Sequence, residues 1–433
     1  MNEIQSRLVP AHPFDPADHH VWRPYTQMKT TPEALPVASA EGVRISLQDG
    51  RELIDGVSSW WTVCHGYRHP HIIEAVKAQL DEVPHVMLGG LTHRPAERLA
   101  QRLAGLTPGD LNHVFFCESG SVSVEIAMKI AMQSWINRGI HGRSKFVCFT
   151  GGYHGDTLAT MSVCDPEEGM HSLFAGGLQP QIVTDLPRDE AGRAAFLDLL
   201  SNRENEIAGI VTEPLVQGAG GMVFHDPSVL RFIREAAGRF NLPLILDEIM
   251  TGFGRLGTMW ACEKAGIVPD IMTVSKALTG GTLPLAAAIA SSRLFADFWS
   301  DDTMAALMHG PTYMGNPAAC AAANASIDLF ETEPRLDQVA AIEARFAETL
   351  PKARHFPGVV DVRWQGAIGV IEMEAMPDLD GLKASFVDAG VWIRPFRNII
   401  YLMPPYIISA EDLDQLIGSC LDVTEAWAKT HFG

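Results

Sequence analysis

The sequence predicts an α/β protein with a mainly parallel sheet, together with a smaller α+β unit. Short apolar runs alternate with helical patterns between residues 66 and 332. Polar residues close two of these runs, at Asp247 and Lys276, and a glycine-rich turn follows each. Beyond this region the pattern changes to an amphipathic helix and short strands. We therefore expect a large domain over residues 66–332 and a small domain made of residues 1–65 and 333–433.

The elements of the large domain follow from its apolar runs. Before the first strand, a helix is expected over residues 95–106, where leucines share one face and Pro108 with Gly109 ends the pattern. The alanine-rich stretch 318–330 is expected to be a buried helix. Strands are expected at residues 113–117, 145–149, 207–213, 243–247, 271–275 and 285–291.

The small domain is predicted from shorter elements. Its helices are expected at residues 336–350 and 410–428. An extended piece near residues 42–47 is expected to join it from the N-terminal side. Its strands are expected at residues 359–363, 367–373, 392–395 and 399–403. Two domains of this kind are expected to enclose a cleft.

The charge and the apolar content of the chain exclude several classes of protein. A net charge of −19 opposes binding to nucleic acid or to anionic membranes. The first twenty residues carry charges without a continuous apolar segment, so no signal peptide is expected. No apolar stretch approaches the ~18 residues that cross a bilayer. The seven cysteines are scattered without metal-ligand spacing, which indicates reduced thiols in a cytoplasmic protein that holds no metal.

Asp247 and Lys276 are the first candidates for chemistry. Both follow apolar strands, and parallel strands bring their carboxyl ends to one edge of a sheet. An amine and an acid at that edge suit pyridoxal phosphate, since the amine forms a Schiff base and the carboxylate keeps the pyridine nitrogen protonated. A lone lysine is more often a surface residue, but the apolar flanks of Lys276 offer little solvated surface. Asp247 could instead be a buried cap or an ion-pair partner, and Glu248 beside it could take either role.

Two glycine-rich turns after strands extend the candidate site. Gly120 and Ser121 open a helix, where backbone N–H groups and the serine hydroxyl can hold a phosphate. The alternative is an ordinary helix N-cap. Tyr153 lies in the second turn, where it could stack on a flat ring while Asp156 supports the neighbouring network. A tight turn with a partly buried tyrosine is the competing interpretation.

Further candidates lie outside these turns. Arg394 at a strand end can bind a carboxylate with two hydrogen bonds, or form a structural ion pair. The turn that contains residues 309–317 offers a hydroxyl and backbone donors. Trp60 and Trp61 are expected in a strand, where adjacent side chains point to opposite faces and one can line a pocket.

Taken together, these segments resemble the class-III (omega) aminotransferases, a family of fold-type-I enzymes that use pyridoxal phosphate. Residues 246–255, 269–271, 275–276 and 280–281 match that family's signature in order and spacing. A closer resemblance, over nearly the whole chain, is to the branch that transfers an amino group from S-adenosylmethionine to 8-amino-7-oxononanoate in biotin biosynthesis. It rests on residues 22–28, 55–61, 87–93, 152–157, 161–166, 216–222, 391–396 and 400–407.

The resemblance implies a role for each matching residue. Lys276 is implied as the Schiff-base lysine, Asp247 as the partner of the pyridine nitrogen, and Tyr153 as the residue stacked on the ring. The phosphate is implied to lie at Gly120 and Ser121, with Pro311 and Thr312 reaching it from the other subunit of a homodimer. Substrate contacts are implied for Tyr25, Trp60, Tyr153, Lys276, Gly310, Arg394 and Tyr401, with Tyr25 also catalytic and Arg255 nearby.

One position departs from this pattern. Arg397 stands where a small residue is expected, and a second cation near Arg394 could alter the affinity for a carboxylate.

The implied mechanism is ping-pong, with the amino donor reacting first and the acceptor second. The alternatives left open are a class-III enzyme for a small ω-amino acid, with pyruvate or 2-oxoglutarate, and a related enzyme that takes lysine as donor. Aromatic residues at positions 25, 60 and 401 favour a long aliphatic chain and an adenine over a small substrate. A regulatory module that binds the cofactor without turnover needs a DNA-binding segment, and a structural protein leaves the candidate residues unexplained.

Overall fold

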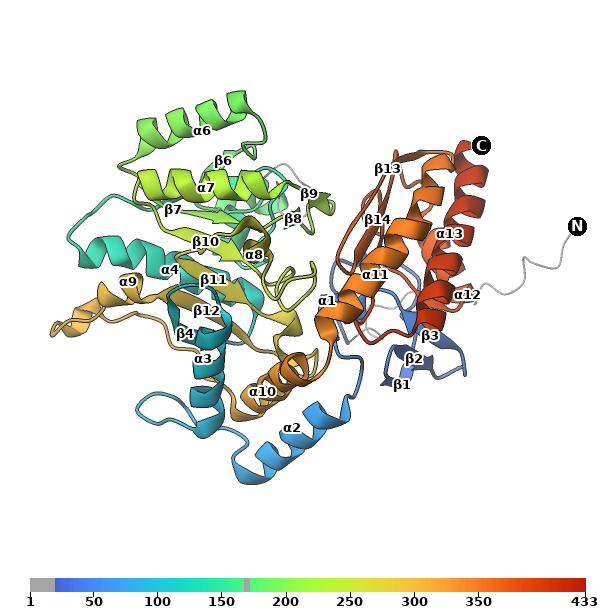
Figure 1. Cartoon of the computed structure of the whole chain (residues 1–433), viewed down its shortest axis with the longest axis horizontal. Helices are drawn as coiled ribbons and strands as arrows, with labels where there is room; N and C mark the ends of the chain where they lie inside the picture. The colour runs from blue at the N-terminus through green and yellow to red at the C-terminus, as the bar shows by residue number, and fades with distance from the viewer. Residues whose placement is uncertain (1–19, 167–171) are drawn as a thin grey trace, which may run out of the picture.

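The computed structural model describes residues 20–166 and 172–433. The N-terminal part of the predicted small domain, residues 1–19, lies outside the described residues, as does all but the last residue of the segment for which no signal peptide is expected. Figure 1 shows two lobes joined near the middle of the molecule. Within the described ranges the strands form four sheets, in the orders β4-β12-β11-β10-β7-β5-β6, β1-β2-β3-β15, β13-β14-β16 and β8-β9.

The seven-stranded sheet of the described chain is the large sheet, and it is mainly parallel as the sequence predicts. Only β12 runs antiparallel to its two neighbours, β11 and β4, among its described pairings. Its strands are β4 (Leu111–Cys117), β5 (Lys145–Phe149), β6 (Ile182–Thr184), β7 (Ile207–Thr212), β10 (Leu244–Asp247), β11 (Ile271–Val274) and β12 (Ala286–Ser291). The three-residue β6 escaped prediction because it is too short to show a period of two.

Helices surround the large sheet, and α4 is the central one. It runs over Gly120–Asn137 and packs against strands β4, β7, β10, β11 and β12. The buried side of α4 is mostly apolar, which explains why this helix packs across the sheet and is not exposed at the surface. The other helices of this lobe are α2 (Pro70–Glu82), α3 (Arg94–Leu106), α5 (Leu158–Ser162), α6 (Glu190–Arg203), α7 (Pro227–Arg239), α8 (Ala261–Ala265), α9 (Ser292–Ala296) and α10 (Pro317–Thr332).

The other lobe combines early and late segments of the described chain. Strand β3 (Glu52–Asp55) pairs in parallel with β15 (Val391–Trp392), so the early and late segments share one sheet. That sheet also holds β1 (Val37–Glu41) and β2 (Arg44–Leu47). The remaining elements of this lobe are β13 (Val359–Gln365), β14 (Ile368–Met373), β16 (Ile399–Leu402), α11 (Arg335–Thr349), α12 (Leu379–Asp388) and α13 (Ala410–Phe432). The small hairpin of β8 (Val216–Gln217) and β9 (Val223–Phe224) belongs to the large lobe.

The segment with the adjacent tryptophans corrects one prediction. Ser58–Trp61, labelled α1, is a single left-handed turn and not a strand, because φ is positive at all four residues, from 47° at Ser59 to 76° at Trp61. Such backbone costs roughly 1–2 kcal/mol per residue. The buried Asp55 carboxylate holds the turn by accepting from the backbone N–H of Val57 at 2.9 Å and of Ser59 at 2.7 Å.

Two features of the whole chain bear on its surroundings. All seven cysteines are buried as free thiols. Among the residues that the structure describes, no helix combines the length and apolar character needed to cross a bilayer.

Candidate active site

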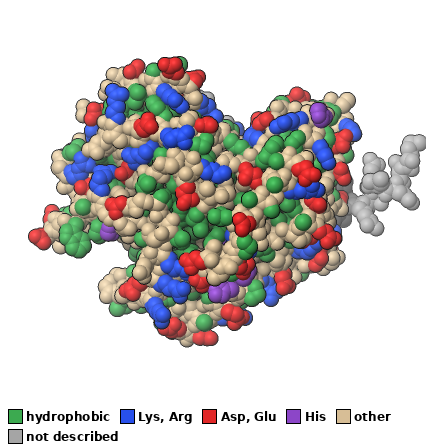
Figure 2. All heavy atoms as spheres, in the orientation of Figure 1, with side chains coloured by type: hydrophobic (Ala, Val, Ile, Leu, Met, Phe, Trp, Pro, Cys, Tyr) green, Lys and Arg blue, Asp and Glu red, His purple; other side chains and the backbone are tan. Residues whose placement is uncertain are grey.

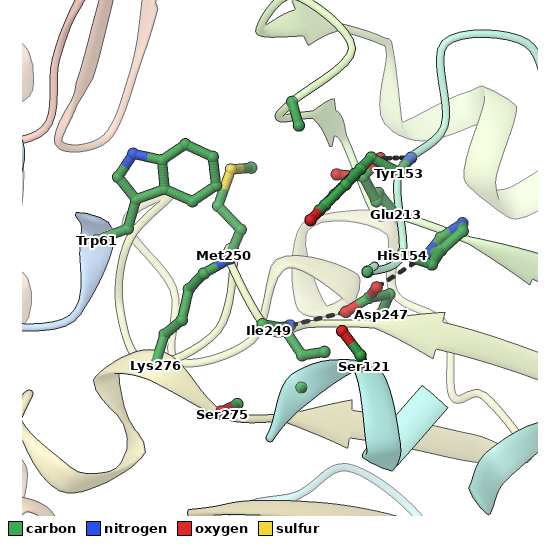
Figure 3. A pocket seen from close by; sticks show the side chains of 13 residues that line it. Trp61, Ser121, Tyr153, His154, Glu213, Asp247, Ile249, Met250, Ser275 and Lys276 are labelled. Carbon is green, nitrogen blue, oxygen red and sulfur yellow. Dashed lines mark hydrogen bonds and ion pairs between the residues drawn. The ribbon is translucent and has the colours of Figure 1, made fainter. Parts of the chain in front are cut away.

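Three neighbouring parallel strands deliver polar side chains to one edge of the large sheet. Strand β10 ends at Asp247, Glu213 follows β7, and Lys276 follows β11 after one residue. All three line a cavity of about 180 Å³, which we call the inner cavity. Figure 3 shows Lys276 on one side of it and Asp247 with Glu213 on the other. The pairing of acid and amine at one sheet edge is therefore present, as expected from the ends of the apolar runs.

Asp247 is buried and held on several sides. Its Oδ2 lies 2.8 Å from His154 Nδ1, and its Oδ1 accepts from the Ile249 backbone N–H at 3.1 Å and from the Thr273 hydroxyl at 3.3 Å. Burial lowers the pKa of His154, but the hydrogen bond and charge of Asp247 outweigh it and raise that pKa overall. His154 is therefore poised to donate to Asp247, which fixes the carboxylate in the cavity wall.

Glu213 is a second buried acid that the sequence analysis missed. Its two carboxyl oxygens accept from the backbone N–H of Tyr153 at 3.0 Å and of Gly218 at 2.8 Å. Burial raises its pKa to about 7, in spite of the nearby His154. The signal that could have found it is the one that marks Asp247, an acid directly after an apolar strand.

Lys276 opens the short 3₁₀ turn η3 (Lys276–Thr279) with φ at +46°. Burial lowers the pKa of its amine, while the charges of Asp247 and Glu213 act in the opposite direction. Its Nζ lies 4.4 Å from the centre of the Trp61 ring. A desolvated lysine in this setting is suited to act as a nucleophile and a base.

The first turn of α4 closes the lower side of the inner cavity. Ser119 is the N-cap, accepting from the Val122 backbone N–H, so Gly120 and Ser121 lie in the first turn. First-turn N–H groups have no partner inside a helix and favour an anion. Gly155 packs against this turn with φ at +129°, and a Cβ there would lie 2.1 Å from the Ser121 hydroxyl oxygen.

A larger outer cavity, of about 700 Å³, adjoins the inner one and shares Trp61, Tyr153 and Lys276 with it. The Asp156 carboxylate accepts from the hydroxyl of Tyr153 at 2.9 Å and from the hydroxyl of Tyr25. Burial and this hydrogen bond raise the pKa of Tyr25 to about 12. Both phenols therefore stay neutral and donate at neutral pH.

The wall of the outer cavity facing Tyr25 is aromatic and cationic. The Arg394 guanidinium lies 4.3 Å from the centre of the Trp60 ring, and Trp60 meets Tyr25 edge-on. Tyr401 accepts from the Trp61 indole N–H at 3.2 Å. Arg397 lines the same cavity, so the unexpected cation does lie beside Arg394.

Other candidates lie outside the inner and the outer cavity. Glu248 is buried beneath α8, where it accepts from the backbone N–H groups of Ala261 and Cys262, so it takes a structural role. Arg255 is buried against the Tyr406 ring at 4.5 Å and donates to the carbonyl of residue 404. Gly310, Pro311 and Thr312 lie on the loop before α10 and line neither cavity.

The inner cavity has the features that a pyridoxal phosphate needs. It offers a buried amine, a carboxylate backed by a histidine, an aromatic ring at Tyr153 and a helix N-terminus for a phosphate. The glycine at position 155 keeps space beside Ser121 that any side chain would fill. Within residues 20–166 and 172–433, no three His, Cys, Asp or Glu side chains are placed to hold a metal ion.

Comparisons with known proteins agree with this chemistry. Residues 25–423 match the family model described as aminotransferase class-III. The adenosylmethionine-8-amino-7-oxononanoate aminotransferase of Mycobacterium leprae is 45% identical over 93% of this chain and 94% of its own. The crystal structure of the Methanocaldococcus jannaschii enzyme of that name superposes with a TM-score of 0.88 at 31% identity, covering 94% of this chain and 97% of that one. An amine transaminase from an uncultivated Pseudomonas species, in its PLP-bound form, gives a TM-score of 0.86 at 29% identity, covering 95% and 99%.

Proposed function

Because this chain belongs to the class-III aminotransferase family, we propose that it transfers the amino group of S-adenosylmethionine to 8-amino-7-oxononanoate, with pyridoxal phosphate as cofactor. The product is 7,8-diaminononanoate, an intermediate of biotin biosynthesis. The observation that carries the proposal is the match over nearly the full length to the Mycobacterium leprae enzyme of that name. The aromatic and cationic outer cavity supports it, since both substrates are long and each bears a carboxylate.

The residues of the inner cavity suit the cofactor. Lys276 would bind it covalently, Asp247 would pair with its ring nitrogen, and the first turn of α4 at Gly120 and Ser121 would hold its phosphate. Tyr153 would lie against the ring. When bound, the cofactor supplies an electron-accepting ring that makes the substrate α-carbon acidic.

The chain's own residues carry the proton. Lys276 Nζ, once released, takes the proton from the substrate α-carbon as a general base and returns it as a general acid. Asp247 would stabilise the positive charge of the cofactor's ring nitrogen, and His154 keeps that carboxylate oriented. Tyr25 contacts both substrates from the mouth of the site and donates its hydroxyl proton in hydrogen bonds.

The outer cavity suits the two substrates. Arg394 would bind the carboxylate of each in turn, a task for which a guanidinium is well shaped. Trp60 and Tyr401 would give apolar and stacking surface to the aliphatic chain and the adenine. Gly310, which lines neither cavity of its own chain, would reach the substrate from the partner subunit. Arg397 would add a second positive charge at this end.

We also propose a homodimer with a shared site. Pro311 and Thr312 line neither cavity of their own chain, and Thr312 is exposed. In a dimer they would reach the phosphate held by the partner subunit.

S-Adenosylmethionine alone tests the proposal. The full-length protein loaded with pyridoxal phosphate is mixed with this donor, and the absorbance of the cofactor is followed. Loss of the starting band, with growth of the pyridoxamine form, is expected. Conversion by lysine or by an ω-amino acid, but not by S-adenosylmethionine, would overturn the choice of donor and leave the aminotransferase activity intact.

The Lys276→Ala variant is the matched control. It is expected to fold and to bind the cofactor without a covalent link, because the rest of the cavity is unchanged. Steady-state transamination by this variant would contradict the role of the lysine.

A further inference from the structure

The Trp61 ring is the aromatic surface that meets the reacting amine. Lys276 Nζ lies 4.4 Å from the ring centre, within the distance at which an ammonium interacts with an aromatic face. Lys276 takes part in no ion pair among the described residues. Figure 3 shows the lysine extending toward Trp61, on the side of the cavity away from Asp247.

The structure holds Trp61 rigidly in this position. Its indole N–H donates to the Tyr401 hydroxyl at 3.2 Å, and the two rings meet edge-on with centres 6.1 Å apart. Tyr401 is itself buried and packs edge-on against Phe396. The left-handed turn at Ser58–Trp61 sets the backbone, so the ring cannot rotate away without loss of these contacts.

The neighbouring tryptophan has a different partner. The Trp60 ring faces the Arg394 guanidinium at 4.3 Å, at the substrate end of the outer cavity. The single left-handed turn thus presents two indole rings to two different cations, one for substrate binding and one at the reacting amine. Trp60 was the residue singled out from the sequence, and the structure adds a distinct role for its neighbour.

The charge on Lys276 changes during the proposed reaction. When the amine takes the proton from the substrate α-carbon, the C–H electron pair stays on the carbon and Nζ becomes an ammonium. This ammonium is buried, and burial disfavours it. The acidic groups that act on it are Asp247, Glu213 and Asp156, and the neutral face of an indole adds attraction without a competing negative charge.

We propose that Trp61 is a catalytic residue whose ring stabilises the ammonium form of Lys276 after proton transfer. This inference rests on the proposed function only in taking Lys276 as the reacting amine. Removal of the ring leaves a buried cation with weaker support.

The test measures the protonation of Lys276 directly, without turnover. The cofactor is removed from the full-length protein, which is then labelled with trace acetic anhydride across a range of pH, and acetylation of the Lys276 peptide is quantified by mass spectrometry. Wild type is compared with Trp61→Phe and Trp61→Leu. Trp364→Leu is the matched control, because its ring faces a cation, Arg354, in another part of the fold.

The expected result is an ordered fall in the pKa of Lys276. Loss of the ring in Trp61→Leu should lower it by about 0.5 to 1.5 units, and Trp61→Phe should lie between, because phenyl attracts a cation less than indole. Trp364→Leu should match wild type. If Trp61 served only as an apolar wall, its truncation would admit water and raise the pKa, and an unchanged or raised value overturns the proposal.

Failure of this proposal is separable from failure of the proposed function. Loss of turnover in Lys276→Ala tests the lysine, whereas the pKa series tests the ring. Trp61→Phe keeps most of the packing, so it yields an answer even if Trp61→Leu does not fold.

Discussion

Asp247 and Glu248 are adjacent acids whose surroundings give them different roles. Asp247 faces the inner cavity beside His154, while Glu248 points into the protein and accepts from the first N–H groups of α8. Burial raises the pKa of Glu248 to about 7 although hydrogen bonds oppose the shift. Sequence reasoning identified the pair but left open which of the two carboxylates takes the functional role, because the direction of each side chain depends on how the strand is placed in the sheet.

Glu213 predicts a pH dependence of stability. Burial raises its pKa from the ordinary 4.5 to about 7, so the folded state binds this proton more tightly than the unfolded state. The contribution of Glu213 to the free energy of unfolding is complete below about pH 4.5 and is lost as the pH rises to about 7. The loss amounts to about 3 kcal/mol.

The Glu213→Gln variant tests this sign. Its free energy of unfolding, measured with urea between about pH 5 and about pH 8, should lose this pH dependence relative to wild type. Glu248 titrates in both proteins and cancels in the comparison. A difference between the two proteins that stays constant across the range would contradict the assignment.

Gly155 predicts a steric effect on cofactor binding. A methyl group there would lie 2.1 Å from the Ser121 hydroxyl oxygen, and the positive φ adds strain. Gly155→Ala should therefore displace Ser121 and weaken pyridoxal phosphate binding by about tenfold to a hundredfold. The dissociation constant can be measured by fluorescence titration of the cofactor-free protein. Ser121→Ala is the matched control, which removes the hydroxyl without the clash.

At the scale of elements, the left-handed turn depends on one buried carboxylate. Asp55 accepts from two backbone N–H groups of the turn and, at 2.6 Å, from the Tyr67 hydroxyl. Its Oδ2 accepts from both the Ser59 N–H and the Tyr67 hydroxyl, so Asp55→Asn can leave both donors unpaired. We expect a loss of about 2–3 kcal/mol in the free energy of unfolding.

The Tyr67→Phe variant removes one of those donors and leaves the carboxylate. It should lower the free energy of unfolding by about 1 kcal/mol. Urea unfolding followed by circular dichroism measures both variants. Equal losses in the two would show that Asp55 does not support the turn.

The elements also show where sequence reasoning succeeds and where it stops. Apolar strands closed by polar residues predicted β10 and β11 and the cavity edge correctly, because that pattern is local. The turn at Ser58–Trp61 could not be predicted, since its positive φ angles depend on Asp55 and on a bond from the Ser58 hydroxyl to the distant Met403 carbonyl. Local propensity there favours a strand, and tertiary contacts override it.

At the scale of the molecule, charge predicts a difference between the two substrates. The chain carries −19, and Figure 2 shows acidic and basic side chains spread over one face. S-Adenosylmethionine has a net positive charge, so a negative protein attracts it over long range. Its kcat/KM should fall about threefold between about 0.05 M and 0.3 M salt, as screening shortens the reach of the field.

The second substrate provides an internal control. 8-Amino-7-oxononanoate carries one charge of each sign and no net charge, so its kcat/KM should change little over the same salt range. Steady-state kinetics with each substrate varied in turn measures both effects. A parallel fall for both would point to an effect of salt on the protein itself.

For the whole molecule, the sequence predicted the α/β class and the mainly parallel sheet, because apolar periodicity records burial along each strand. It also singled out Asp247, Lys276, Gly120, Ser121 and Tyr153, which all line the inner cavity, but it missed Glu213 and His154. The contact of Trp61 with Lys276 could not be predicted, since the two residues lie 215 positions apart in the chain. Such a contact depends on how the two lobes meet.

The pairing of β3 with β15 has a consequence for how the chain matures on the ribosome. All strands of the large sheet in the described part of the chain lie within residues 111–291, so that layer can assemble before residues 391–403 are made. The tryptophan turn must wait, because its supports at Val391–Trp392 and Met403 emerge after the whole of that sheet. A nascent chain can thus form the sheet that carries Asp247 and Lys276 before it forms the tryptophan turn that lines the outer cavity.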